Sequence, residues 1–129
     1  MDQEARPLTF RRITEAEAVA LLGDMQALEP AGCPFDMREL VAGAHCFRIE
    51  GAASAVYVMR ERGEVAWVEA AKGCGDVDVT EVLDQAMTLQ ARGFRRLAMQ
   101  TKRAGLVRKL TRRGWTVRGW IMTKELNND

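Results

Sequence analysis

The spacing of apolar residues changes period several times along the chain, and each change predicts a new helix or strand. Residues 8–12 have the pattern of a short first strand. Thr14 and Glu17 then form a capping-box sequence, and apolar residues at helical spacing follow it until shortly before Pro30. The sequence FDMREL predicts a second, short helix that ends near Gly43. The first third of the chain is therefore expected to form one strand and two helices.

From His45 onward, apolar and polar residues alternate with a period of two, which is typical of half-buried strands. The alternation and its turns predict three consecutive antiparallel strands, at residues 46–50, 55–60 and 65–70. A helical pattern then predicts a crossover to a parallel neighbouring strand, with the helix at 79–92 and the strand at 94–100.

The last quarter of the chain predicts one more helix and one more strand. Thr101 can begin a helix that Gly114 ends, and the sequence WTVRGWIMTKE at 115–125 predicts a final strand. The elements follow the order β-α-α-β-β-β-α-β-α-β, which indicates a mixed α/β domain. The 129 residues contain no linker, repeat or low-complexity stretch, so we expect a single domain over residues 1–129.

Composition excludes several classes of protein. No apolar run approaches the roughly 20 residues that span a bilayer. The first residues, MDQEARPLTF, lack the apolar core of a signal peptide, so a cytoplasmic protein without membrane contact is expected. The three cysteines share no metal-ligand spacing and the chain has a single histidine, His45, so no metal site is predicted.

The net charge of +1 hides a strong asymmetry along the chain. Residues 85–124 carry 11 basic and no acidic residues, whereas residues 1–84 carry 8 basic and 16 acidic ones, a net charge of −8. The basic part is expected to attract the acidic part of a second copy, giving a homodimer. Nucleic acid and a merely solvated basic face are the alternatives, although no recognised helix-turn-helix or base-stacking motif supports the first of them.

A glycine-containing turn lies where the third antiparallel strand gives way to the crossover helix, in the sequence AAKGCGDVDVTEVL. Backbone N–H groups in such a turn can hold a phosphate at the N-terminus of a helix. However, the turn contains Asp76 and Asp78, and Asp78 with Glu81 has the spacing of a capping box. A helix N-terminus capped by its own side chains is the favoured interpretation, and a phosphate site is the alternative.

The order of elements and the segment TKRAGLVRKLTRRGWTVRGWIMTKEL resemble the GNAT superfamily of acyl-CoA N-acyltransferases. In that family the fourth strand leads into a turn of the form Q/R-x-x-G-x-G/A that binds the pyrophosphate of CoA. The sequence KGCGDV falls at that place, and Gly114 and Trp115 match the glycine and aromatic residue before the family's final strand. The resemblance covers nearly the whole chain, mainly as an order of elements.

The resemblance implies acetyl-CoA as cofactor and an amine, on a small molecule or a protein, as acyl acceptor. The implied cofactor contacts are Val68, Ala70, Lys72, Gly73, Cys74 and Gly75, with the pantetheine between the fourth and fifth strands. Glu69 lies where many members carry the general base for the amine. A Glu at a strand end is more commonly salt-bridged or solvent-facing, and this alternative stays open.

The chain departs from the family pattern at two positions. Val77 stands where a small residue is expected, and Leu110 stands where many members carry the tyrosine that protonates the leaving thiolate. With the acidic turn, these departures favour an alternative function. In it, the chain is a catalytically inactive GNAT-like binding or structural module with a degenerate CoA loop, of the kind expected in a phage or prophage. On either view, carboxylates in the turn should keep CoA binding weak.

Overall fold

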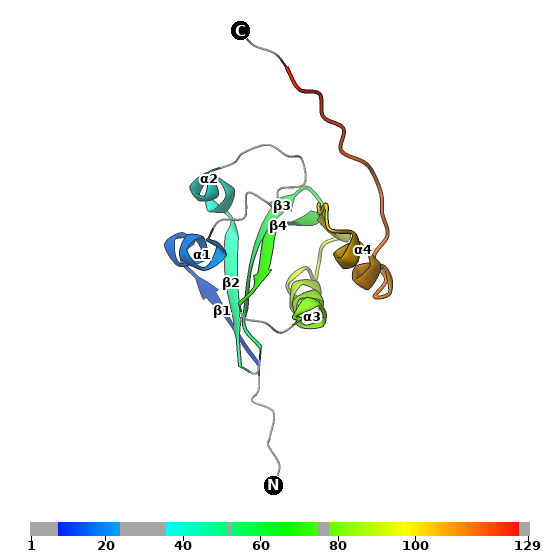
Figure 1. The fold of residues 1–129 in the computed structure, drawn as a ribbon. Helices are drawn as coiled ribbons and strands as arrows, with labels where there is room; N and C mark the ends of the chain where they lie inside the picture. The colour runs from blue at the N-terminus through cyan, green and yellow to red at the C-terminus, as the bar shows by residue number, and fades with distance from the viewer. Residues whose placement is uncertain (1–7, 24–35, 52, 75–77, 127–129) are drawn as a thin grey trace.

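A computed structural model describes residues 8–23, 36–51, 53–74 and 78–126. Its elements, in chain order, are β1 (Thr9–Ile13), α1 (Glu15–Leu22), α2 (Met37–Val41), β2 (His45–Glu50), β3 (Ala55–Arg62), β4 (Val65–Gly73), α3 (Thr80–Gln90), β5 (Arg96–Met99) and α4 (Ala104–Thr111) (Figure 1). None of the helices in these ranges is long and apolar enough to cross a membrane.

The five strands form one open mixed sheet in the order β1-β2-β3-β4-β5. Neighbouring strands from β1 to β4 are antiparallel, and β5 is parallel to β4 after the crossover through α3. The predicted antiparallel strands and the parallel neighbour of the third are therefore confirmed. The fold is mixed α/β. The alternation of apolar and polar residues, bounded by turn residues, had already specified which segments could pair as strands.

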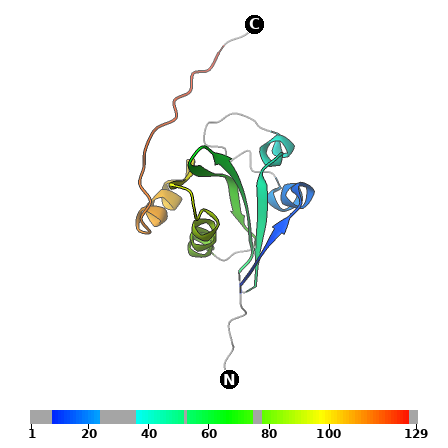
Figure 2. The same ribbon diagram turned by 180° about the vertical axis from the view of Figure 1, so that it is seen from behind.

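Helices cover both faces of the sheet, with α1 and α2 on one side and α3 on the other (Figures 1 and 2). Successive residues of β3 supply the two cores in turn, since Val56 and Val58 pack with α1 and α2, whereas Tyr57 and Met59 pack with α3. All four side chains are at least 95% buried. The middle strand thus forms part of two hydrophobic layers, which explains its nearly continuous apolar sequence.

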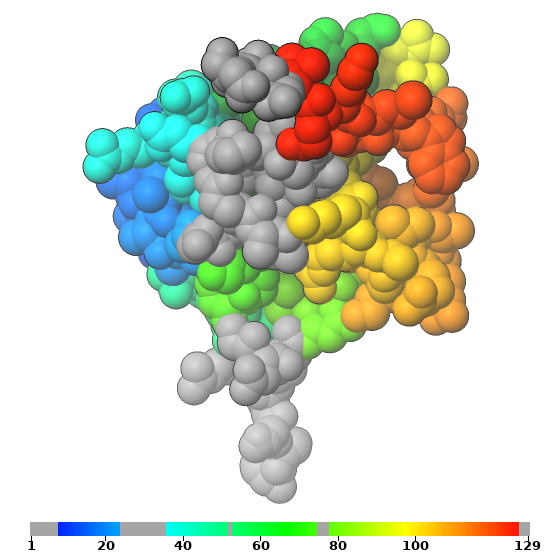
Figure 3. All heavy atoms as spheres, turned by 45° about the horizontal axis from the view of Figure 1, so that its top comes forward, coloured from blue at the N-terminus to red at the C-terminus, as the bar shows by residue number. Residues whose placement is uncertain are grey.

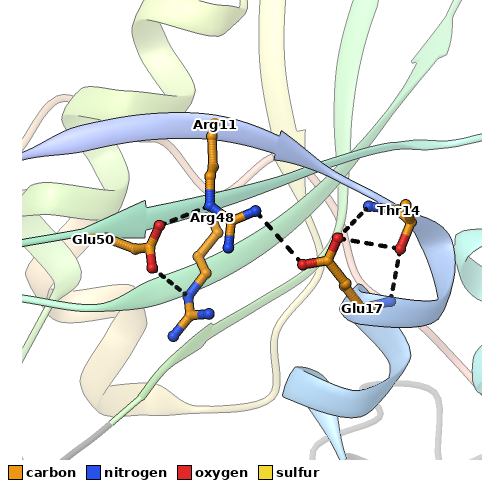
Figure 4. A network of polar contacts seen from close by, with 5 residues as sticks. All are labelled: Arg11, Thr14, Glu17, Arg48 and Glu50. Carbon is orange, nitrogen blue, oxygen red and sulfur yellow. Dashed lines mark hydrogen bonds and ion pairs between the residues drawn. The ribbon is translucent and has the colours of Figure 1, made fainter.

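The N-terminus of α1 is held by the capping box that the sequence predicts. The Thr14 hydroxyl accepts from the Glu17 amide at 3.1 Å, and the Glu17 carboxylate accepts from the Thr14 amide at 3.4 Å. Figure 4 shows how a second carboxylate oxygen of Glu17 extends this box to Arg11, which also bonds Glu50 on β2. The network joins β1, α1 and β2 through partly exposed side chains.

Thr14→Ala should lower the free energy of unfolding by about 1 kcal/mol, because the substitution leaves the first-turn amides of α1 without their acceptor. Urea unfolding followed by circular dichroism measures the change. Thr116→Ala, at an exposed position outside any helix, is the matched control and should be neutral. Equal stability of Thr14→Ala and the parent protein would show that the cap is replaced by water at no cost.

Two predicted elements differ from the structure. The helix expected to run to Pro30 ends at Leu22, where Gly23 adopts φ +59° and donates to the Val19 carbonyl; residues 24–35 lie outside the described ranges. The predicted last strand at 115–125 is not formed, and residues 115–126 carry no regular secondary structure. A strand is stable only when a neighbour receives its hydrogen bonds, and this segment has none in the described part of the chain.

Candidate functional site

A cleft opens where β4 parts from β5. The two strands pair only from Val65 with Arg96 to Val68 with Met99, although β4 continues to Gly73. From Glu69 onward β4 therefore has no strand beside it on that edge within the described residues. A cavity of about 880 Å³ occupies the space, lined mainly by β4, α3 and α4. Its size suits a ligand larger than a single amino acid.

A β-bulge marks the point of divergence. Val58 of β3 pairs with Ala70, and the next residue, Met59, pairs with Val68. Glu69 is therefore the extra residue of β4, without a partner on β3. Bulges bend a strand and leave backbone groups outside the ladder. The bend thus falls at the position that the family resemblance assigns to the general base. The sequence contains no glycine or other sign of this bulge.

The Glu69 side chain is largely buried and lies between two arginines. Its carboxylate is 3.7 Å from Nε of Arg60 and 3.3 Å from a terminal nitrogen of Arg62, and 13% of the side chain is exposed. Arg62 also lies over the Trp67 ring, 4.6 Å from its centre. The salt-bridged interpretation of Glu69 is therefore confirmed. These two contacts fix the orientation of the carboxylate, because an arginine fork holds a carboxylate in a defined geometry.

The predicted cofactor residues occupy the same stretch of β4 but have other partners. Val68, Ala70, Lys72 and Gly73 all line the cleft. The Lys72 ammonium donates to the Leu22 carbonyl at 3.0 Å, so it closes the end of α1 instead of standing free. Ala70 packs on the side of α1 and α2, opposite to Val68. These residues therefore lie along the cleft, but the ammonium of Lys72 is engaged at the end of α1.

The turn after β4 is only partly described. Gly73 must be small, since a Cβ there would lie 2.7 Å from a methyl group of Val79, and this packing explains the glycine without any ligand. The Cys74 amide donates to the Ser54 carbonyl at 2.8 Å, and Cys74 does not line the cleft. Gly75, with residues 76 and 77, lies outside the described ranges.

Asp78 caps the start of α3 from within the turn. One carboxylate oxygen accepts from the amide of Thr80 at 3.0 Å and from its hydroxyl at 2.7 Å. The other oxygen accepts from the Lys109 ammonium of α4 at 2.6 Å. These hydrogen bonds, first that of Lys109 and then those of Thr80, hold the pKa of Asp78 well below its usual range. The predicted bond from Asp78 to the first-turn amides is confirmed at Thr80, but the predicted capping box with Glu81 is not formed, because Val79 is the N-cap residue of α3.

Besides Arg62 and Lys72, two further cations at the cleft come from α4 and the residue before it. Arg103 and Lys109 both line it, and Arg103 is exposed. Sequence reasoning counted them only as part of the basic segment, because nothing in their spacing shows which strand α4 approaches. Leu110, at the place of the family's tyrosine, is 5% exposed and packs at the cleft wall. Among the described residues, no group of three or more His, Cys, Asp and Glu side chains could hold a metal ion.

Comparison of the chain with protein-family models, with curated proteins and with solved structures gives no match. The function is therefore argued from the cleft alone.

Proposed function

We propose that the chain is an acyl-CoA-dependent N-acyltransferase with weak affinity for its cofactor, acetyl-CoA. The observation that carries the proposal is the cleft formed where β4, bulged at Glu69, leaves β5. An extended pantetheine can add to the free edge of β4 as a strand would, through its own amide groups. The cleft is long enough to reach from there to the basic residues of α4, where the phosphates would lie.

Acyl transfer needs a base for the amine and a donor for the developing oxyanion. In the proposed reaction the amine nitrogen attacks the thioester carbonyl, the C–S bond breaks, and Glu69 takes the amine proton. Backbone N–H groups of β4 that have no strand partner donate to the carbonyl oxygen, an arrangement that stabilises its negative charge in the transition state. Leu110 cannot protonate the thiolate, so water in the open cleft supplies that proton.

The two arginines beside Glu69 favour a second candidate function. Arg60 and Arg62 both hold the carboxylate, so an amine that approaches Glu69 has to compete with two ion pairs. The second candidate is an inactive GNAT-like module that binds acetyl-CoA, or another extended ligand, in the same cleft without turnover. The two functions differ in one measurable property, which is release of CoA thiol.

Glu69→Gln should lower thiol release from acetyl-CoA at least about 100-fold, since a glutamine keeps the shape of the side chain but cannot accept the proton. Acetyl-CoA binding, measured by calorimetry, should stay the same. The assay uses a panel of small amines and peptide amines, with a thiol reagent as detector. Glu64→Gln, in the β3–β4 hairpin turn, is the control and should leave both quantities unchanged.

The same two measurements separate the candidates. Binding with no thiol release in the parent protein supports the inactive module. Equal thiol release by the parent protein and Glu69→Gln removes Glu69 from the mechanism. No calorimetric signal up to about 1 mM acetyl-CoA, in the parent protein and in a variant with the acidic turn neutralised, contradicts the acyltransferase and restricts the inactive module to ligands other than acetyl-CoA.

A further inference from the structure

The C-terminal segment, residues 115–126, exposes apolar side chains that a folded domain normally covers. Val117 is 58% exposed, Trp120 90%, Met122 91% and Leu126 73%. In the space-filling view the segment, orange to red, arches along the outside of the molecule with an opening beneath it (Figure 3). Contiguous apolar groups of this kind mark an interaction site.

The opening beneath the segment is bounded on its other side by the edge of the sheet. β5 pairs only with β4, so its other edge is free in the described part of the chain. A hollow of about 1000 Å³ lies between them, lined by Leu97 and Met99 of the strand and by Val117 and Ile121 of the segment. Paired strands lie only about 4.8 Å apart. The segment therefore stands off from its own β5 by the width of the hollow.

The start of the segment is fixed in this position. Arg113 and Trp115 both donate to the Asp84 carboxylate of α3, at 2.6 and 2.8 Å. Between them Gly114 takes φ +97°, which turns the chain away from α4. The segment thus leaves the domain from a fixed anchor, and its pairing partner has to come to it.

We propose that the segment of each chain lies as a strand in the hollow of a second copy, where it is flanked by β5 and by the C-terminal segment of that second copy. A two-fold axis then relates the two segments, which pair antiparallel with each other, and the sheets of both copies become continuous. The free strand edge and the unpaired strand belong to the same chain. A two-fold exchange therefore satisfies both at once and in equal numbers.

The area involved suits a stable dimer. An aromatic side chain such as Trp120 buries about 150–250 Å² when fully covered. Each copy offers it together with other large apolar side chains at 43% exposure or more, namely Leu89, Val117, Ile121, Met122 and Leu126. Covering these residues and the receiving edges on both copies gives a total of about 1,500–2,000 Å². This range is that of a standard specific interface.

Charge gives this dimer a recognisable signature. The hollow and the segment together carry more basic than acidic side chains, namely Arg96, Arg113, Arg118 and Lys124 against Asp84 and Glu125, so the seam between the copies has a net positive charge on both sides. Added salt screens this repulsion, so the dimer should tighten as salt is raised from about 0.05 to about 0.5 M. A dimer that pairs the acidic part of one copy with the basic part of another should weaken instead.

The test is sedimentation of the full chain over a range of concentrations, in the parent protein and in the double variant Trp120→Asp/Ile121→Pro. The proline removes a strand hydrogen bond and the aspartate an apolar contact, both outside the folded core. We expect the dissociation constant of the dimer to rise at least 100-fold. Phe10→Asp changes a similarly exposed side chain on β1, at the opposite edge of the sheet, and should leave the dimer intact.

Hydrogen exchange identifies the pairing strand. The amides of Arg96–Met99 should gain protection in the dimer relative to the dilute protein. A dimer that survives the double variant, or one that leaves these amides unprotected, overturns the proposal. A protein that stays monomeric at about 100 μM in 0.5 M salt also overturns the proposal. This holds whether the segment then pairs with β5 of the same chain or stays unpaired.

Discussion

Asp84→Ala is expected to lower the free energy of unfolding by about 3 kcal/mol, the largest loss of stability among the substitutions considered. Asp84 is 7% exposed, on the inner side of α3. Its carboxylate accepts from Arg113 at 2.6 Å and from the Trp115 indole at 2.8 Å. Truncation leaves a half-buried guanidinium and a partly buried indole without their acceptor, and removing one partner of a buried ion pair typically costs several kcal/mol.

Two further variants separate the contributions to this loss. Asp84→Asn keeps an acceptor for the indole but removes the charge that pairs with Arg113, so an intermediate loss is expected. Trp115→Phe removes a single hydrogen bond and should cost about 1 kcal/mol. Urea unfolding at neutral pH measures all three variants. A loss below about 1 kcal/mol for Asp84→Ala would show that water replaces the carboxylate.

Asp78→Asn is expected to raise the affinity for acetyl-CoA at least tenfold. The carboxylate lies at the cleft, where it repels phosphates and holds the ammonium of Lys109 at 2.6 Å. Asparagine removes the charge and releases Lys109 for a phosphate, while its side-chain oxygen still accepts from the Thr80 amide. The double variant Asp76→Asn/Asp78→Asn tests the expectation from the sequence that both carboxylates of the turn weaken CoA binding.

Calorimetry with acetyl-CoA measures the affinity, and Glu64→Gln, with the same change of net charge in a distant turn, is the control. Lys109→Met in the Asp78→Asn background should cancel the gain if the released ammonium holds a phosphate. Submicromolar binding by the parent protein would show instead that Asp78 does not face the ligand. An unchanged affinity in the variant would place the phosphates away from the start of α3.

The stability of the protein at acidic pH is an independent test of the contacts of Asp78. Its pKa is lowered in the folded protein, so its ion pair and cap stabilise the fold above the ordinary Asp pKa of about 3.9. That contribution is lost as the pH falls below this value towards the lower folded-state pKa. The stability of Asp78→Asn should therefore fall less than that of the parent protein over the same acidic range.

Local sequence patterns predicted most of the elements. The capping box at Thr14, the alternation from His45 to Ala70 and the cap at Asp78 all depend on residues within a few positions of one another. Their physics is local, so one sequence is enough to reveal them. The alternation also placed Val68, Glu69 and Ala70 on one strand, but it put Lys72 and Gly73 in the turn that follows, whereas β4 continues to Gly73. All five residues lie at the cleft.

What the sequence determined by itself was therefore the mixed α/β order, the antiparallel strands and the parallel crossover, because period and turn residues act over short distances. Tertiary structure alone decided the rest. It placed the bulge at Glu69, and it formed contacts between residues 7 to 31 positions apart in the chain. These contacts are those of Glu69 with the arginines of β3, of Asp78 with Lys109, and of Asp84 with Arg113 and Trp115. It also left the segment at 115–126 unpaired, since a strand pattern specifies a strand only where a neighbouring edge is within hydrogen-bonding reach.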